Sequence, residues 1–256
     1  MGGVILLMLL QASYPTIGAA PARPPAPPPF AVGERFEYSA KLGILTLGSA
    51  SIEVVGIDTM RGEPAWNFQF TLESSSALFK MTSRLSSWTA TDDFTSLRYE
   101  QYSKEKSKEY VREYDIFPDS GFYRQKGVAG TKPTIDEPLD DASFLYFIRT
   151  TELAVGKTYT YDRYFRPDKG PITITVLKRE TMELPDGTKV ECLVINPVVG
   201  EKTFAKKNRA RIWITDDARR IPVQIQSELV GTITLRLKRI ASAGGSGSPD
   251  AEHSSR

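Results

Sequence analysis

The feature that most constrains the fold of this chain is an alternation of apolar and polar residues with a period of two. In residues 36–42 four apolar residues alternate with Glu, Ser and Lys, and in residues 66–72 a band that begins with Trp66, Phe68 and Phe70 alternates with polar residues. This spacing puts successive side chains on opposite faces of a β-strand, so one face is expected to be buried. Similar runs occupy residues 50–55, 83–91, 97–102, 109–117, 158–165, 172–184, 190–196, 210–215, 223–230 and 233–237.

Turn residues separate these runs. The Pro-Asp-Gly sequence at residues 185–187 predicts a tight hairpin, and residues 119–121 and 230–232 predict two more with weaker signals. Long helical patterns are missing, which argues against the crossovers of nucleotide-binding α/β folds. The sequence therefore predicts an antiparallel meander.

Two short segments predict helices. Asp140 and Asp141 precede an aromatic run, so an aspartate can cap a helix of about ten residues there; residues 75–81 give a weaker signal. A sheet of ten or more strands must curl, close or split, and the helices are expected to plug an opening or cover an edge. The predicted fold class is all-β, with one large curved antiparallel sheet, as a half-barrel or a barrel, and one or two short helices.

The two ends are expected to lie outside the domain. Residues 4–10 are continuously apolar but too few to span a bilayer, and they suit a secretory signal over residues 1–22, with cleavage after Ala22 preferred to cleavage after Ala20. A buried N-terminal strand or helix is the alternative. We predict a Pro-rich linker at 23–29, which acts as a stiff spacer or docks on an aromatic groove, one all-β domain at 30–240 and a disordered tail at 241–256. The predicted location is periplasmic or secreted.

The scarcity of reactive residues limits the chemistry. The chain of 256 residues holds one histidine, His253, and one cysteine, Cys192. These counts exclude a Ser-His-Asp triad in the folded part, a Cys-His pair, a His-rich zinc site and an internal disulfide. The net charge of +2, from 33 Lys and Arg against 31 Asp and Glu, argues against a nucleic-acid binder. We expect no enzyme, no cofactor and no catalytic or metal-binding residue, and Cys192 is expected to be a small buried residue.

Carboxylate chemistry is the one enzymatic possibility that these counts leave. Three Asp-Asp pairs, at residues 92–93, 140–141 and 216–217, could meet as a calcium site or a hydrolase site. Each pair lies between predicted elements, where aspartates cap helices and turn the chain. We favour the structural interpretation for each pair.

A second set of residues suggests ligand binding. Aromatic side chains on predicted inward faces could line a cavity, and arginines beside an aromatic residue could hold a phosphate or carboxylate head group. The alternatives are a solid aromatic core and a salt-bridged turn made by the arginines with Asp216 and Asp217. The candidate ligand-binding residues are Trp66, Phe68, Phe70, Trp213, Arg211, Arg219 and Arg220.

Residues 104–114 alternate basic and acidic side chains. If fully extended, they would place lysines, Arg112 and two tyrosines on one face, which could lie on an anionic membrane or on single-stranded nucleic acid. A turn at residues 104–108 would break this register, and lysines on exposed strands also prevent aggregation. We favour that simpler interpretation.

Three groups of motifs stand out. They lie at residues 29–34 with 38, 42–44 and 48–50; at 140–143 with 145–149 and 153–157; and at 212–223, which is the most specific. Together they resemble the bacterial, mostly proteobacterial, exported domain-of-unknown-function family numbered 3108. The resemblance implies an exported all-β protein of uncharacterised function. The architecture is more loosely similar to the half-barrels of periplasmic lipoprotein carriers, which hold acyl chains.

Two functional hypotheses follow. The first is a noncatalytic exported envelope protein that binds a lipid, the acyl chains of a lipoprotein or another amphipathic ligand in a curved sheet. The second is a structural or assembly protein that presents a sheet edge or the hairpin at 104–108 to an envelope partner.

Overall fold

The computed structural model describes residues 27–76, 79–200, 209–228 and 232–241. The predicted signal sequence, most of the Pro-rich linker, the tail with His253 and two residues of the predicted turn at 230–232 lie outside these residues. The strands are β1 (Arg35–Leu42), β2 (Leu45–Met60), β3 (Glu63–Ser76), β4 (Phe79–Ala90), β5 (Ser96–Glu105), β6 (Lys108–Phe117), β7 (Phe122–Gln125), β8 (Lys132–Pro133), β9 (Thr158–Tyr161), β10 (Ile172–Glu183), β11 (Lys189–Val199), β12 (Arg209–Thr215), β13 (Pro222–Glu228) and β14 (Thr232–Ala241). The helices are α1 (Ser143–Thr150) and the short 3-10 turns η1 (Pro118–Ser120) and η2 (Pro167–Lys169).

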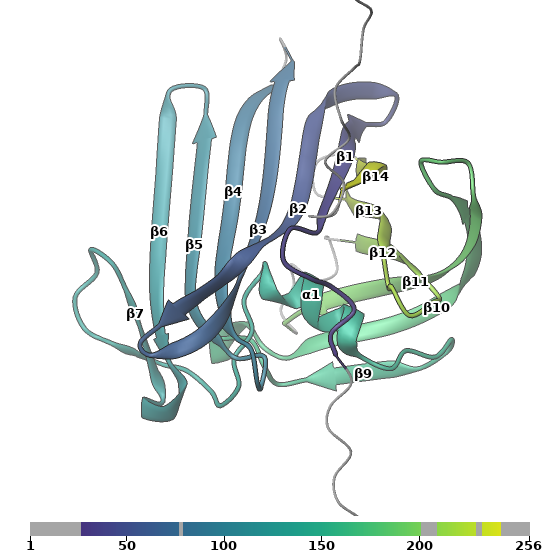
Figure 1. The fold of residues 1–256 in the computed structure, drawn as a ribbon. Coiled ribbons are helices and arrows are strands. Elements are labelled where there is room, and N and C mark those ends of the chain that lie inside the picture. The colour runs from purple at the N-terminus through teal and green to yellow at the C-terminus, as the bar shows by residue number, and fades with distance from the viewer. Residues whose placement is uncertain (1–26, 77–78, 201–208, 229–231, 242–256) are drawn as a thin grey trace, which may run out of the picture.

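The strands of the described residues form one antiparallel sheet that is not closed into a barrel (Figure 1). Its order is β8-β7-β6-β5-β4-β3-β2-β1-β14-β13-β12-β11-β10-β9. Neighbours in the sheet are neighbours in sequence except where β1 pairs with β14 and joins the two ends of the domain. Register shifts in the β1, β2 and β10 ladders are β-bulges or irregularities of the kind that increases twist and curvature. The prediction of a large curved antiparallel sheet is confirmed, in its half-barrel form.

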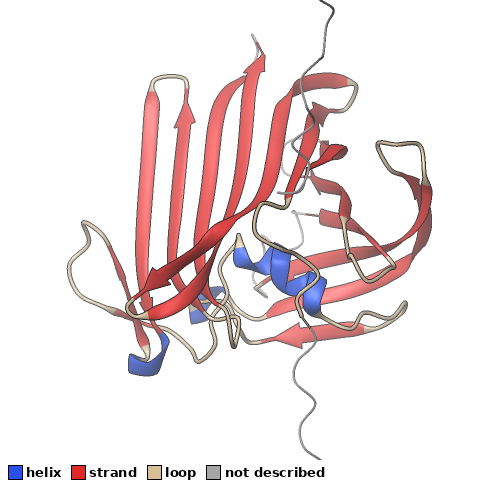
Figure 2. Cartoon of the chain, viewed as in Figure 1, coloured by secondary structure: helices blue, strands red, loops and turns tan. Residues whose placement is uncertain are grey.

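Helix α1 lies within the curve of the sheet, against its concave face (Figures 1 and 2). The Asp140 carboxylate accepts hydrogen bonds from the backbone N–H groups of Ala142 and Ser143, both at 2.9 Å. An aspartate therefore satisfies the first N–H groups at the helix start, but it does so from two residues before the N-cap residue, Ala142, which has no side-chain cap bond of its own. The helix has eight residues instead of about ten because Thr151 is already extended, with φ −89° and ψ 147°.

The other predicted helix, at residues 75–81, is wrong. Strands β3 and β4 continue into this segment as a hairpin, and Ser76 pairs with Phe79. A seven-residue helix is too short to be stable by itself, and the ladder between two long strands supplies the backbone hydrogen bonds instead. The predicted hairpin at residues 185–187 is confirmed by hydrogen bonds from the Gly187 N–H to the Leu184 carbonyl and from the Leu184 N–H to the Thr188 carbonyl.

Two clusters of buried apolar residues fill the curve of the sheet around α1. Strand β11 contributes to both, with Leu193 and Ile195 in one cluster and Cys192 and Val194 in the other. Both faces of this strand are therefore buried. Cys192 is a free, buried core residue as expected, and burial raises the pKa of its thiol to about 12.

A buried ion pair ties the N-terminal segment to α1. The guanidinium of Arg149, near the end of the helix, has a side chain that is only 1% exposed and lies 2.6 Å from a Glu34 carboxylate oxygen. The same guanidinium donates hydrogen bonds to the carbonyls of Pro29 and Arg219. Arg149 therefore connects the entry to β1, the helix and the turn before β13.

In the described parts of the chain, no helix combines the length and the apolar character needed to cross a membrane.

Candidate functional site

The filling of the concave face stops part of the way along strands β5 and β6. Tyr99 and Tyr114 are paired across these strands, their rings are stacked with centroids 6.0 Å apart, and both are buried in the core. The next pair on the same face is Gln101 with Arg112, followed by Ser103 with Tyr110. We call the stretch of the concave face that the core clusters and α1 cover, which ends at Tyr99 and Tyr114, the packed part.

Beyond the packed part lie two adjoining cavities, which we call the groove. Their volumes are about 390 and 520 Å³, and they share Gln101 and Arg112. The first is lined by Ser83, Leu85, Gln101, Tyr102, Ser103, Glu105, Tyr110 and Arg112, and the second by Gln101, Arg112, Asp141, Tyr164, Arg166, Asp168, Lys169, Val199 and Gly200.

Half-buried apolar side chains continue the face of the groove onto β3 and β4. Phe70 pairs with Leu85, and Leu72 pairs with Ser83, so all four side chains share one face of the sheet. Phe70 and Leu72 pack against one core cluster and Leu85 against the other, but none of the three is fully buried. The groove thus has apolar and polar lining side by side.

The inner end of the groove is built around Asp141, just before α1. Its carboxylate accepts hydrogen bonds from the hydroxyls of Tyr99 (2.8 Å) and Tyr164 (2.9 Å) and from the Gln101 amide (3.3 Å). Burial, reinforced by the Asp141 charge, raises the pKa of both tyrosines far above the usual value. Both hydroxyls therefore stay protonated and keep donating to Asp141.

Three cations also line this inner end. Arg112 comes from β6, Arg166 directly precedes η2, and Lys169 ends η2. Within the described residues none of the three forms an ion pair. The Arg166 guanidinium lies 5.3 Å from the centroid of the Phe165 ring. The pKa of Lys169 is lowered mainly by desolvation and further by the positive charge of Arg166. Positive charge therefore exceeds negative charge here, although the charge of Asp141 acts on both Arg166 and Lys169.

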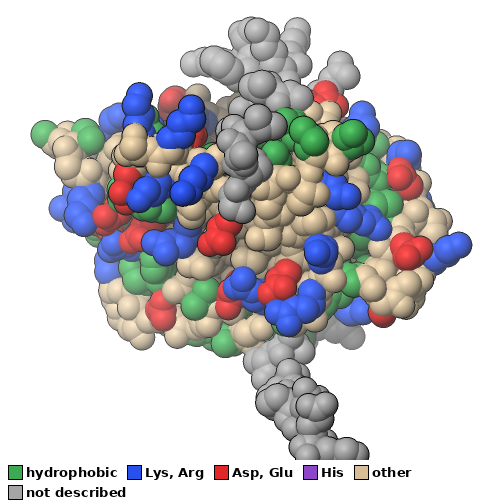
Figure 3. Space-filling view, turned by 90° about the horizontal axis from the view of Figure 1, so that it is seen from above, with side chains coloured by type: hydrophobic (Ala, Val, Ile, Leu, Met, Phe, Trp, Pro, Cys, Tyr) green, Lys and Arg blue, Asp and Glu red, His purple; other side chains and the backbone are tan. Residues whose placement is uncertain are grey.

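On the face of the molecule seen from above, charges of both signs are mixed. Figure 3 shows Lys and Arg side chains interspersed with Asp and Glu side chains on the face seen from above. This face has no broad region of one sign.

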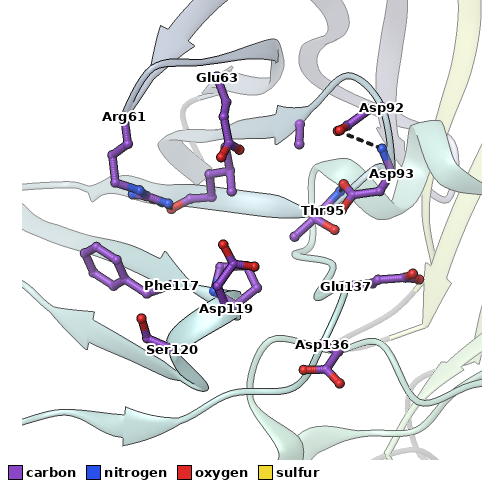
Figure 4. A pocket seen from close by; sticks show the side chains of 13 residues that line it. Arg61, Glu63, Asp92, Asp93, Thr95, Phe117, Asp119, Ser120, Asp136 and Glu137 are labelled. Atoms are coloured by element: carbon purple, nitrogen blue, oxygen red, sulfur yellow. Dashed lines mark hydrogen bonds between the residues drawn. The ribbon is translucent and has the colours of Figure 1, made fainter.

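A third cavity, of about 400 Å³, has the opposite character, and we call it the acidic cavity (Figure 4). Its carboxylates are those of Glu63, Asp92, Asp93, Asp119, Asp136 and Glu137. Asp92 and Asp93 accept hydrogen bonds from the backbone N–H groups of Asp93 and Thr95, which is turn chemistry. Among the residues that the structure describes, no three His, Cys, Asp or Glu side chains are arranged to hold a metal ion.

The three Asp-Asp pairs do not converge. Residues 92–93 lie at the acidic cavity, residues 140–141 at the start of α1, and residues 216–217 in the turn between β12 and β13. The structural interpretation holds in the last turn, because Asp217 accepts hydrogen bonds from the Thr215 hydroxyl and from the side chain of Arg219.

The aromatic candidate residues lie mainly in the packed part. Phe68 is fully buried and stacks on Tyr146 of α1 with ring centroids 3.9 Å apart, and Trp66 stacks on Phe68. Trp213 belongs to the same core cluster, and Phe70 lies at the boundary with the groove. None of these four lines the groove cavities.

The arginine candidates lie apart from the groove. Arg219 and Arg220 form ion pairs with Asp217 and Asp216, and Arg211 is exposed on β12. The lining of the groove was only partly visible in the sequence. Asp141 and Arg112 belong to patterns noted there, whereas Arg166 and Lys169 have no local signal and reach the groove through the path of the chain after β9.

These observations define a class: an all-β protein whose open, curved antiparallel sheet surrounds a short helix and leaves a groove with mixed lining. The chain belongs to the family described as protein of unknown function DUF3108, whose profile matches residues 37–238. The resemblance inferred from the sequence motifs is thereby confirmed.

Two solved structures of other proteins match this chain to different degrees. A beta-barrel-like protein of domain of unknown function DUF1849 from Brucella abortus superposes with a TM-score of 0.52 at 12% identity, covering 82% of this chain and 98% of that one. A putative lipoprotein from Parabacteroides distasonis ATCC 8503 matches with a TM-score of 0.30 at 9% identity, covering 83% and 96%. The Brucella likeness concerns the fold alone. No curated protein gives a significant match.

Proposed function

We propose that this is a noncatalytic, exported envelope protein that binds an amphipathic ligand in the groove. The observation that carries the proposal is the boundary at Tyr99 and Tyr114, beyond which the concave face bears half-buried apolar side chains beside open volume. Cavities of about 390 and 520 Å³ fall in the range of small-molecule sites.

The mixed lining favours an amphipathic ligand over a plain hydrocarbon. Leu85, with Phe70 and Leu72 beside it, offers apolar surface, while Gln101 and Ser103 place polar side chains at the same volume. An acyl chain with a polar head meets both requirements.

Export rests on the sequence, and the noncatalytic part of the proposal rests on the sequence and on the environment of the single cysteine. The apolar run at residues 4–10 supports export, and the single cysteine is buried with a raised pKa, which makes it a poor nucleophile.

Native mass spectrometry of the gently purified full chain with oleyl alcohol, a neutral long-chain probe, tests the proposal. We expect a one-to-one adduct, and Leu85→Asp should weaken it by at least about tenfold, because it places a charge on the apolar floor. Thr82→Asp is the matched control, since it puts the same charge on the other face of β4 and should leave the adduct unchanged. Absence of any adduct, or equal loss in both variants, contradicts the proposal.

The alternative is an assembly protein, and one observation favours its hairpin version. The turn between β5 and β6 is exposed, and Val111 near it is 58% exposed on the outer face. The sheet edges are less suitable, because β8 has two residues, one of them proline, and β9 has four. A photo-crosslinker at Lys106 in cells should capture one dominant protein if this alternative is right, and diffuse labelling counts against it.

A further inference from the structure

The inner end of the groove has more positive charge than its own acids neutralise. Arg112, Arg166 and Lys169 line it together with two carboxylates, Asp141 and Asp168. Asp141 is already bound by two tyrosine hydroxyls and an amide, and in the described part of the chain neither acid lies within ion-pair distance of these cations. The cations therefore keep donors for another partner.

We infer that this inner end binds the anionic head group of the ligand, as a carboxylate or a phosphate monoester. The inference rests on the proposed function and specifies the ligand class. A planar guanidinium recognises a carboxylate or phosphate with two parallel hydrogen bonds, and an ammonium adds a compact charge.

The arrangement is preorganised on one side. The Arg166 guanidinium lies over Phe165 and within 5.9 Å of the ring centroids of Tyr114 and Tyr164, and its Nε atom is buried without a hydrogen-bond partner. Arg166 lines the cavity, so an oxyanion that enters it comes within reach of this side chain. Arg112, two residues from Tyr114 on the same face of β6, is exposed at the same cavity.

Asp141 does not block an anion at this position. Its charge is shared among three donors, and the same hydrogen bonds hold Tyr99, Tyr164 and Gln101 in place as a polar wall. The net charge of the five ionised side chains remains positive. Among the described residues, the carboxylates of the acidic cavity form no group of three that could hold a metal ion.

Gly200 shapes the remaining wall. Its φ is +79°, and a Cβ atom there would lie 2.9 Å from the carbonyl oxygen of Lys169. Glycine thus allows the end of β11 to approach η2 closely, which fixes the position of Lys169 at the groove.

The experiment compares four probes on the full chain: oleyl alcohol, oleate, oleyl phosphate and inorganic phosphate, each titrated by calorimetry and native mass spectrometry. The three acyl probes share one chain and differ in the head group. We expect oleate and oleyl phosphate to bind at least about tenfold more tightly than oleyl alcohol, as a charge-assisted hydrogen bond allows.

Charge-removing variants locate the effect. Lys169→Gln and Arg112→Gln should each reduce severalfold the ratio of the affinity for the anionic probes to the affinity for oleyl alcohol. Arg166→Gln should also reduce this preference, and Arg166→Lys should restore part of it. If Arg166→Gln does not fold, the variants at the exposed residues Arg112 and Lys169 provide the test. Lys178→Gln, an exposed position on β10 outside the groove, is the control.

The outcomes separate the two proposals. Equal binding of all three acyl probes overturns the head-group inference and leaves the proposed function standing. No binding of any acyl probe overturns the proposed function. If inorganic phosphate alone then binds, and binding is lost in Lys169→Gln, the site takes a small soluble anion and not a lipid head group.

Discussion

The packed part and the groove are successive stretches of the same face of the same strands, yet they differ in what covers them. On β5 and β6 the change occurs within one residue pair, from Tyr99 and Tyr114 to Gln101 and Arg112. Helix α1 and the core clusters cover the first stretch, and open volume faces the second. The comparison shows that alternation selects which face is inward but not which part of that face is filled.

The largest expected effect is in the packed part. Phe68→Ala should lower the free energy of unfolding by about 3–5 kcal/mol, because it removes a fully buried ring stacked on Tyr146. Leu85→Ala in the groove should cost no more than about 1.5 kcal/mol, since that side chain is only half buried. Urea unfolding of both variants measures the difference, and equal losses would mean that the groove is packed as densely as the core.

The buried ion pair gives the next effect. Glu34→Gln leaves the Arg149 charge buried without its acid and should cost about 3 kcal/mol. Glu37→Gln removes the partner of the exposed Arg239 and should cost at most about 1 kcal/mol. Thermal and urea unfolding of the two variants provide the test, which fails if the surface pair proves the more important.

Asp140, buried at the start of α1, gives a pH-dependent effect. Burial raises the pKa of its carboxyl to about 6, although Ser87 donates a hydrogen bond to it. The folded state therefore takes up the proton more readily than the unfolded state, and stability falls as the pH rises from about 4 through about 6. Relative to Asp140→Asn, the wild type should lose up to about 3 kcal/mol over this range. Urea unfolding of both proteins at the two ends of the range provides the measurement. If the pKa of the carboxyl is not raised, the difference in free energy of unfolding between the wild type and Asp140→Asn will be the same at both pH values.

A smaller effect is expected at the wall of the groove. Gly200→Ala should cost about 2 kcal/mol, because a positive φ and a close carbonyl both oppose a side chain. Gly187→Ala has a similar φ of +85° but no atom within 4 Å of the added Cβ, so it should cost about 1 kcal/mol. The difference between the urea midpoints of the two variants measures the cost of the close contact between residue 200 and the Lys169 carbonyl. Identical midpoints would show that this contact has no effect on stability.

The smallest effect on stability is expected for the groove cation Arg112. Arg112→Gln should change the free energy of unfolding by no more than about 0.5 kcal/mol, because the side chain is exposed and, among the described residues, takes part in no ion pair. A larger loss by chemical unfolding would show that Arg112 supports the fold and not a ligand.

Much of the local structure could be predicted. The strand runs, the hairpin at residues 185–187 and the cap by Asp140 depend on neighbours in sequence, and each agrees with the structure. The segment at residues 75–81 was assigned wrongly because its pairing across β3 and β4 outweighs a weak helical preference. The aromatic candidates were expected to face inward, which Phe68 does, but the sequence could not distinguish a filled core from a lined cavity.

The sequence by itself determined the class of this protein: alternation with a period of two specifies strands and an inward face, and the counts of histidine and cysteine limit its chemistry. Only the tertiary structure decided that the sheet stays open, that β1 pairs with β14, and that Arg166 and Lys169 meet Arg112 beside Asp141. The physical reason is the distance along the chain between the residues that interact. Side-chain direction within a strand follows from local backbone geometry, whereas the filling of the face depends on where α1 packs and on contacts between residues far apart in the chain.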